Sequence, residues 1–411
     1  SDDDDASDDD DASDDDDASD DDDASDDDDA SDDDDSLPSA PDCDVEIVEA
    51  AGDTTLSTPQ ELVTFCSQYN ATAGDLLFAP DLETLDGLGC LCQVGGTLAL
   101  SNRQHFTDVL SNLASVGGDV LAPEGEGTSL ERIQLTALTS IGGDLRAIGS
   151  SLGDVDLPLL TSIGGDLTLV VPAVVGGDLS MPALATVGGD LSVSNTGVAE
   201  LALPALSSVG GDLRVEGLYS LTALSLPLLA SVDGSVELID NHQIAQPALP
   251  ALTAAGGLVF EGNAAMTAFE GPLLTALSGP IDFFNNAALA TLDLSGLPSA
   301  TGLRLEECWT LSALDLGSLT AVTGDVALVN LSTLASVDGL SALQSIDGDL
   351  SLSDDHSLTT LTGLHAVTSV GGDVLIRDNP VLPTSQADAL IAAIEPGNIA
   401  GTVTIVNNAN N

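Results

Sequence analysis

Aspartate is the residue with the clearest chemical potential in this 411-residue chain, and it opens the sequence as a repeated cluster. Positions 1–36 consist of five copies of SDDDDA followed by SDDDDS, which places 24 aspartates in 36 residues. Clustered carboxylates are hard oxygen ligands of the kind that calcium prefers. We therefore expect weak cation binding in this tail, represented by its first cluster, Asp2, Asp3, Asp4 and Asp5. The alternative is a solubilising spacer, because charges this dense repel one another and keep the segment extended.

The residue types that enzymes use are scarce or scattered elsewhere. All six basic residues are arginines, so lysine chemistry such as Schiff-base formation is excluded. The four histidines share neither a repeat unit nor the spacing of zinc ligands; they are His105, His242, His356 and His365. Arg146, Arg214 and Arg304 fall at one outward strand position of a repeat, which indicates a structural role. We predict that the protein is not an enzyme and carries no cofactor beyond weakly bound calcium.

The overall charge restricts the partners of the chain. A net charge of -62 repels nucleic-acid phosphates and anionic lipid, so neither is expected to bind directly, whereas cations are. No apolar run approaches the roughly 18 to 20 residues of a membrane-spanning helix, so we expect no membrane insertion. The sequence starts at Ser1 without Met or an apolar leader, so any export signal is expected to have been removed already.

A Gly-Asp-apolar unit recurs through the rest of the chain and indicates the fold. Its anchoring positions are 74, 96, 118, 143, 165, 189, 211, 234, 256, 279, 301, 324, 348, 372 and 401. In the unit from Gly211 to Val232, Leu213 and Val215 alternate like a short strand, and further apolar residues follow each turn. One unit cannot bury its apolar face alone, but stacked units form a continuous core. We predict an all-β fold, a parallel β-helix or solenoid of about fifteen rungs of 22–25 residues.

Three further columns of residues are expected to stack from rung to rung. Prolines recur at a corner where a fixed φ is useful, at Pro158, Pro182, Pro204, Pro227, Pro250, Pro272 and Pro298. Amide or carboxyl side chains follow each anchor, at Asn102, Asn195, Asn241, Asn263, Asn286, Asn330, Asp355, Asn379 and Asn408. The anchoring aspartates form the third column, at Asp75, Asp119, Asp144, Asp166, Asp190, Asp212, Asp325, Asp349 and Asp373. Each of these carboxylates is expected to accept hydrogen bonds from turn amides, the alternative being calcium held between rungs.

From Cys43 onward the chain resembles the receptor L-domain family, whose members are right-handed β-helical, leucine-rich modules, and among them the repetitive bacterial surface proteins. The resemblance rests on Cys43-Asp-Val-Glu-Ile, on a helix that starts in Ser57-Thr58-Pro59-Gln60-Glu61-Leu62 and ends at Cys66, and on the repeated Gly-Asp-Leu rungs. Asn379-Pro-Val-Leu-Pro-Thr, a helix around residues 385–394 and a last strand at residues 402–405 resemble the matching C-terminal cap. The resemblance implies a right-handed solenoid with short helical caps at both ends.

Four segments follow from these patterns. They are a disordered poly-Asp tail at 1–36, an N-terminal cap and first rung at 37–92, solenoid repeats at 93–380 and a C-terminal helix-and-strand cap at 381–411. An extra Gly-Gly-Asp at 176–178 falls inside one repeat and is expected to replace its middle segment.

Four of the five cysteines lie in the N-terminal cap, as an oxidised cap of the family type requires. This implies a disulfide between Cys43 and Cys66, whereas the partners of Cys90 and Cys92 stay open because the two lie too close for a comfortable mutual bridge. Cys308 falls at the amide column and is expected to be a buried thiol.

Together, the cysteines, the resemblance and the tail predict an extracellular or cell-surface location. The function we expect is a non-catalytic β-solenoid that binds a protein or glycan ligand or mediates adhesion, with the tail as stalk or cation-binding arm. The alternative is a structural protein of an envelope, matrix or fibre. Capped ends would favour a monomer over self-association.

Overall fold

The computed structural model describes residues 43, 46–82, 84–100, 109–122, 132–148, 154–170, 179–195, 197–394 and 397–410. The chain divides into two units, Ser1–Ser39 and Ala40–Asn411, and every described residue belongs to the second. The acidic clusters Asp2, Asp3, Asp4 and Asp5 therefore lie outside the described residues, as do Asn102, Arg103, His105 and the Gly-Gly-Asp at 176–178.

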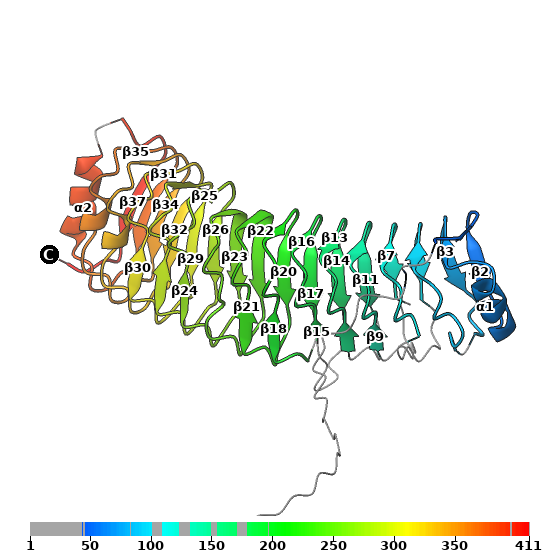
Figure 1. Cartoon of the computed structure of the whole chain (residues 1–411). Coiled ribbons are helices and arrows are strands. Elements are labelled where there is room, and N and C mark those ends of the chain that lie inside the picture. Colours follow the sequence, from blue (N-terminus) through cyan, green and yellow to red (C-terminus); the bar gives the residue numbers. More distant parts are fainter. Residues whose placement is uncertain are drawn as a thin grey trace, which may run out of the picture. The chain divides into compact units, whose positions relative to one another are not determined.

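The second unit is a parallel β-solenoid in which each coil pairs with the coil before and after it (Figure 1). This confirms the all-β fold class. Each of the fifteen anchors precedes a strand or, at 234 and 256, lies within the long strands β22 and β23, and Gly52-Asp53 opens one more rung, so the number of rungs differs slightly from the expected fifteen. Longer strands form where the residues after each Gly-Asp alternate between buried and half-exposed, as in β20.

The strands that follow each Gly-Asp form one column and line the core. Its members are β2 (Thr54–Leu56), β4 (Leu76–Phe78), β6 (Leu98–Ala99), β8 (Val120–Leu121), β11 (Leu145–Ile148), β14 (Leu167–Val170), β17 (Leu191–Ser194), β20 (Leu213–Glu216), β22 (Ser231–Ile239), β23 (Ala254–Glu261), β26 (Ile281–Phe284), β29 (Leu303–Glu306), β32 (Val326–Val329), β34 (Leu350–Ser353), β36 (Val374–Arg377) and β37 (Val403–Val406).

A second column of short strands precedes each Gly-Asp, and β22 and β23 run through both columns. The others are β1 (Glu49–Ala50), β3 (Ala71–Thr72), β5 (Gln93–Val94), β7 (Ser115–Val116), β10 (Ser140–Ile141), β13 (Ser162–Ile163), β16 (Thr186–Val187), β19 (Ser208–Val209), β25 (Ala276–Leu277), β28 (Ser299–Ala300), β31 (Ala321–Val322), β33 (Ser345–Ile346) and β35 (Ser369–Val370).

The third side of the coil is less regular. It is formed by β9 (Arg132–Gln134), β12 (Asp154–Asp156), β15 (Leu179–Ser180), β18 (Glu200–Ala202), β21 (Ala223–Ser225), β24 (Ala268–Glu270), β27 (Thr291–Asp293) and β30 (Ala313–Asp315), and then by the 3-10 turns η1 (Asp338–Leu340) and η2 (Thr362–Leu364).

The core is one continuous column of Leu, Val, Ile and a few Phe side chains. In the coil that starts at Gly211, the apolar residues expected to face inward are all buried, at Leu213, Val215, Leu221, Leu224, Leu226, Leu229 and Val232. Prolines follow the third side at a turn, as expected, except that Pro298 lies outside this register because Ser295 and Gly296 occupy the turn. The column therefore holds six of the seven prolines that the spacing placed there.

The two ends of the solenoid differ. Helix α1 (Pro59–Cys66) starts where expected, capped by the Thr58 side chain, and buries Leu62 and Phe65 in the core. Helix α2 (Thr384–Ala393) also forms, but it does not cover the last strand, β37, in which Val403 is 43% exposed. Val374, its partner in the preceding coil, is fully buried. The C-terminal helix and strand are confirmed, whereas the core column remains open at β37.

Candidate functional site

Both pairs of N-terminal cysteines are oxidised, but not as the resemblance implied. Cys43 is bonded to Cys92 and Cys66 to Cys90, with Cα–Cα distances of 5.9 and 5.6 Å. The expected Cys43–Cys66 disulfide is therefore wrong. Cys66 and Cys90 are 24 residues apart, about one coil, and lie on adjacent coils. Cys43 and Cys66 are 23 residues apart, so the spacing fits one coil equally well for the expected pair and does not decide between them. The fold decides, because it brings Cys43 next to Cys92, 49 residues further along the chain.

The aspartate column connects consecutive coils through the backbone. The Oδ1 atom of Asp144, for example, accepts a hydrogen bond of 2.8 Å from the backbone N–H of Asp166. All nine predicted aspartates make this contact, at 2.6 to 2.9 Å. The expectation that backbone amides satisfy these carboxylates is confirmed, with the amide supplied by the next coil. Among the described residues, no three His, Cys, Asp or Glu side chains group as metal ligands.

A buried ladder of amide side chains follows the strands that line the core. Asn241, Asn263 and Asn286 are fully buried, and the Oδ1 of each accepts the backbone N–H of the equivalent residue one coil earlier at 3.1 Å. Each Nδ2 donates at 2.8 Å to the carbonyl oxygen of an equivalent strand residue in the preceding coil, which is Val215, Leu238 or Phe260. Asn379 and Asn408 continue the pattern.

Asn195 and Asn330, which were expected in this ladder, lie one position before it. Their φ angles are 54° and 56°, in the left-handed region that Asn tolerates. At this corner a residue in the left-handed conformation is thus followed directly by the buried ladder residue. The two positions form adjacent columns. The one-residue offset separates them because the left-handed residue turns the chain, so that only the next side chain points inward.

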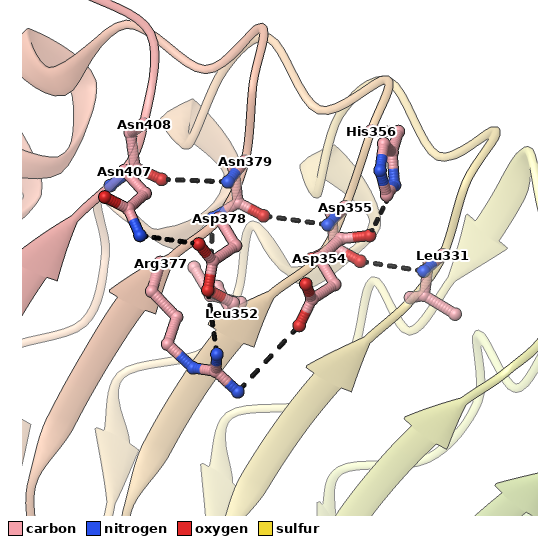
Figure 2. A network of polar contacts seen from close by, with 10 residues as sticks. All are labelled: Leu331, Leu352, Asp354, Asp355, His356, Arg377, Asp378, Asn379, Asn407 and Asn408. Carbon is pink, nitrogen blue, oxygen red and sulfur yellow. Dashed lines mark hydrogen bonds and ion pairs between the residues drawn. The ribbon is translucent and has the colours of Figure 1, made fainter.

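Two ladder positions carry chemistry other than an amide. Cys308 is fully buried and its Sγ donates to the carbonyl oxygen of Phe283 at 3.6 Å, as an Asn Nδ2 would. Burial raises the pKa of the Cys308 thiol to about 12, which confirms the expectation of a buried free thiol. Asp355 is 1% exposed and occupies the ladder as a carboxyl group (Figure 2).

The arginines are engaged in ion pairs on the outer surface. Arg214 contacts Glu216 at 2.9 Å and Glu237, and Arg304 contacts Glu306 at 2.7 Å and lies 4.4 Å from the centroid of the Phe284 ring. Together with Arg146, they occupy the second, half-exposed position of β20, β29 and β11, as the repeat predicted. Since Arg214 and Arg304 are neutralised by neighbouring carboxylates, the exposed surface retains the acidic excess of the chain.

An exposed column of rings, which sequence reasoning did not identify as a site, follows the buried ladder directly. Tyr219 and Trp309 are 58% and 45% exposed, and His242 and His356 share their position on other coils. The ring centroids of Tyr219 and His242 lie 5.5 Å apart. Trp309 is the only tryptophan of the chain and Tyr219 is one of two tyrosines. The superposition of repeat units could have revealed this aromatic column, because it aligns Trp309 with Tyr219.

A groove of about 610 Å³ runs along the glycine corner of the first coils. Its floor is formed by glycine backbone, and hydroxyl groups of Ser115, Ser140 and Ser162 belong to its walls. A Cβ atom at Gly117 would collide with the carbonyl oxygen of Gly95, so the floor admits only glycine. Glu49 is the one titratable residue among those that line the groove.

Two of the histidines lie beside backbone carbonyl oxygens. The Nδ1 of His242 lies 2.8 Å from the Gly262 carbonyl oxygen, and that of His356 lies 2.9 Å from the Asp354 carbonyl oxygen. His365 ends η2. Within the described residues, no helix has the length and apolar character needed to cross a bilayer.

Comparisons with known proteins add little to this picture. No protein-family model and no curated protein matches the chain. A solved structure described as "Crystal structure of TLR13-ssRNA13 complex" is 13% identical, with a TM-score of 0.23 and a match over 82% of this chain. The match spans 63% of the length of that solved chain. At this level of similarity it supports no statement about function.

Proposed function

We propose that the protein is a non-catalytic binding module of the extracellular space or cell surface, with the acidic tail as stalk or cation-binding arm. The two disulfides at the start of the solenoid support an oxidising compartment. The resemblance to receptor L-domains, and within them to repetitive bacterial surface proteins, is consistent with the same location. Both features concern where the protein acts. The class of ligand is therefore inferred from the exposed side chains of the solenoid.

The observation that carries the binding proposal is the aromatic column of Tyr219, His242, Trp309 and His356. Exposed aromatic rings contribute large contact area at a small entropy cost, and they are enriched in binding sites. Each ring follows a residue of the buried ladder, so its backbone is held by the neighbouring coils. At a coil spacing of about 4.8 Å, Tyr219 and Trp309 lie roughly 19 Å apart along the column.

A neutral glycan is the ligand class that this column fits best. Its rings offer flat apolar faces beside hydrogen-bonding groups, and the acidic surface disfavours polyanions. A protein is the alternative ligand class. Proton or hydride transfer needs groups placed for it, and the column contains only the two histidines, several coils apart.

The proposal is tested with a glycan array and a cell-surface pull-down, each with and without calcium. The Tyr219→Ala/Trp309→Ala variant is expected to lose binding at least tenfold. Leu228→Ala/Leu273→Ala is the matched control, because these leucines are 57% and 54% exposed at a different corner. Equal binding by the two variants would refute the aromatic column as the ligand site.

A structural, self-associating role is the second candidate, and the open end at β37 favours it. Val403 and Val406 are 43% and 44% exposed there, and no strand is paired to the outer side of β37 in the described part of the chain. Association through two β37 edges would join two copies end to end. Light scattering over a concentration series tests this: a dimer that is lost in Val403→Lys would establish self-association.

A further inference from the structure

Asp355 places a carboxyl group at a position of the buried ladder that is an asparagine in other coils, such as Asn286 and Asn379. Its Oδ1 accepts the backbone N–H of Leu331 at 2.8 Å, and its own backbone N–H donates to Oδ1 of Asn379 at 2.9 Å. Both contacts are those of an asparagine in the same ladder (Figure 2). The second oxygen, Oδ2, is buried and has no hydrogen-bond partner.

The other ladder residues show what belongs at the position of Oδ2. In the next coil, Nδ2 of Asn379 donates to the Leu352 carbonyl oxygen at 3.1 Å. Two coils before Asp355, the Cys308 thiol donates to the equivalent carbonyl oxygen, that of Phe283. Leu352 pairs with Leu328 in the preceding coil. The register therefore places the Leu328 carbonyl oxygen as the acceptor for position 355, where a donor is required.

The charged groups around Asp355 do not supply a counter-ion. On its own coil it is flanked by Asp354 and His356, whose Nδ1 contacts the Asp354 carbonyl oxygen. On the next coil, Arg377 pairs with Asp378 at 2.7 Å and with the Asp354 carboxylate at 3.9 Å. In the preceding coil, the segment Val326–Leu334, which includes the Leu331 partner of Asp355, contains no titratable residue. No group of three potential metal ligands occurs among the described residues, and a proton on Oδ2 would neutralise the carboxyl group and supply the missing donor.

We propose that Asp355 is a neutral carboxylic acid in the folded protein, that its Oδ2–H donates to the Leu328 carbonyl oxygen, and that this proton makes the C-terminal coils sensitive to pH. The carboxyl group then completes the ladder as an asparagine would, with one acceptor and one donor. An ionised Asp355 would instead bury an unpaired charge against a carbonyl dipole. Burial raises the pKa of Asp355 to about 8, and the nearby Asp354 charge adds to this rise, while the Leu331 amide opposes it.

The direction of the pH effect follows from proton linkage. Asp355 binds its proton more tightly in the folded state than in the unfolded state, where the pKa of Asp is about 3.9. The stability it contributes is complete below that value, and it declines as the pH rises toward about 8. The protein is thus expected to hold its C-terminal coils most firmly in acid. Because His356 directly follows Asp355, the same proton also supports the backbone at the His356 position of the exposed aromatic column.

The test compares full-length wild type with Asp355→Asn by denaturant unfolding between pH 4 and pH 9. The amide supplies the donor at every pH. The ratio of the wild-type to the variant unfolding constant is therefore expected to rise about tenfold per pH unit from about pH 4 to about pH 8. Asp354→Asn is the matched control, since it removes the exposed neighbour and should show no such slope relative to wild type.

A pH-independent ratio for Asp355→Asn would overturn the proposal. A second measurement avoids any dependence on cooperative unfolding of the whole solenoid. At pH 7, the infrared spectrum of the folded wild type should contain a protonated-carboxyl band that is missing from Asp355→Asn and retained in Asp354→Asn. Absence of that band from the wild type would show that the group is ionised, and would equally refute the proposal.

Discussion

The Oδ1 atom of Asp190 accepts a hydrogen bond of 2.8 Å from the backbone N–H of Asp212, one coil further along the solenoid. The same Oδ1 atom lies where a Cβ atom of residue 211 would be placed, so Gly211 is required there. The Gly and Asp of the repeat are therefore coupled between coils, because the Asp carboxylate of one coil occupies the space that the missing Cβ atom of the next coil's Gly leaves open. This relationship explains why the two residues recur together at nearly every anchor.

Gly211→Ala is expected to reduce the free energy of unfolding by about 1–3 kcal/mol, because the new methyl group displaces the Asp190 carboxylate. Asp190→Ala removes that carboxylate, so the double variant should be more stable than the sum of the single effects by about 1 kcal/mol. Denaturant unfolding of the four proteins measures this coupling. Gly302→Ala is the control, since its nearest neighbour lies at 3.7 Å and the change should cost little. Strict additivity would contradict the contact.

Non-reducing peptide mapping is expected to find Cys43 joined to Cys92 and Cys66 joined to Cys90. The Cys43–Cys92 disulfide closes a longer loop than the Cys66–Cys90 disulfide. Its removal in Cys43→Ser/Cys92→Ser should therefore reduce the free energy of unfolding by about 4 kcal/mol, against about 3 kcal/mol for Cys66→Ser/Cys90→Ser. Recovery of a Cys43–Cys66 peptide would contradict this connectivity.

Cys308 is expected to resist thiol reagents in the folded protein and to react only on unfolding, because it is fully buried and its pKa is raised to about 12. Cys308→Asn should leave the fold intact and increase stability by about 1 kcal/mol, since an amide donates more strongly to the Phe283 carbonyl oxygen than a thiol does. Labelling with and without denaturant, and thermal unfolding of the variant, check the two parts. Rapid labelling of the native protein would count against the buried position.

Calcium is expected to bind mainly to the tail. The 24 closely spaced aspartates of residues 1–36 are expected to take up several ions weakly, with strong dependence on ionic strength. The solenoid aspartates already accept backbone amides, so deletion of residues 1–36 should remove most uptake and leave the melting temperature nearly unchanged. Tight stoichiometric binding by the truncated protein, with a large calcium-dependent rise in melting temperature, would instead identify the aspartate column as a metal site.

Much of the solenoid could be predicted from the sequence because its information is periodic. The 22–25-residue spacing of Gly-Asp places chemically equivalent residues on consecutive coils, so strand positions, buried apolar residues and the aspartate contacts follow from one unit such as 211–232. The helices α1 and α2 were also predictable, because their starting signals are local.

What only the tertiary structure decided concerns which atoms meet across coils. The partners of Cys43 and Cys66, the one-residue offset of Asn195 from the buried ladder and the open end at β37 each depend on the exact path of the chain at a corner or an end. The unpaired Oδ2 of Asp355 belongs to the same class. A repeat length fixes which residues stack, whereas side-chain direction and burial at a turn depend on a left-handed residue that shifts the inward position by one. For this reason the sequence by itself determined which residues repeat from coil to coil. The tertiary structure determined which of their side chains are buried and which atoms contact each other.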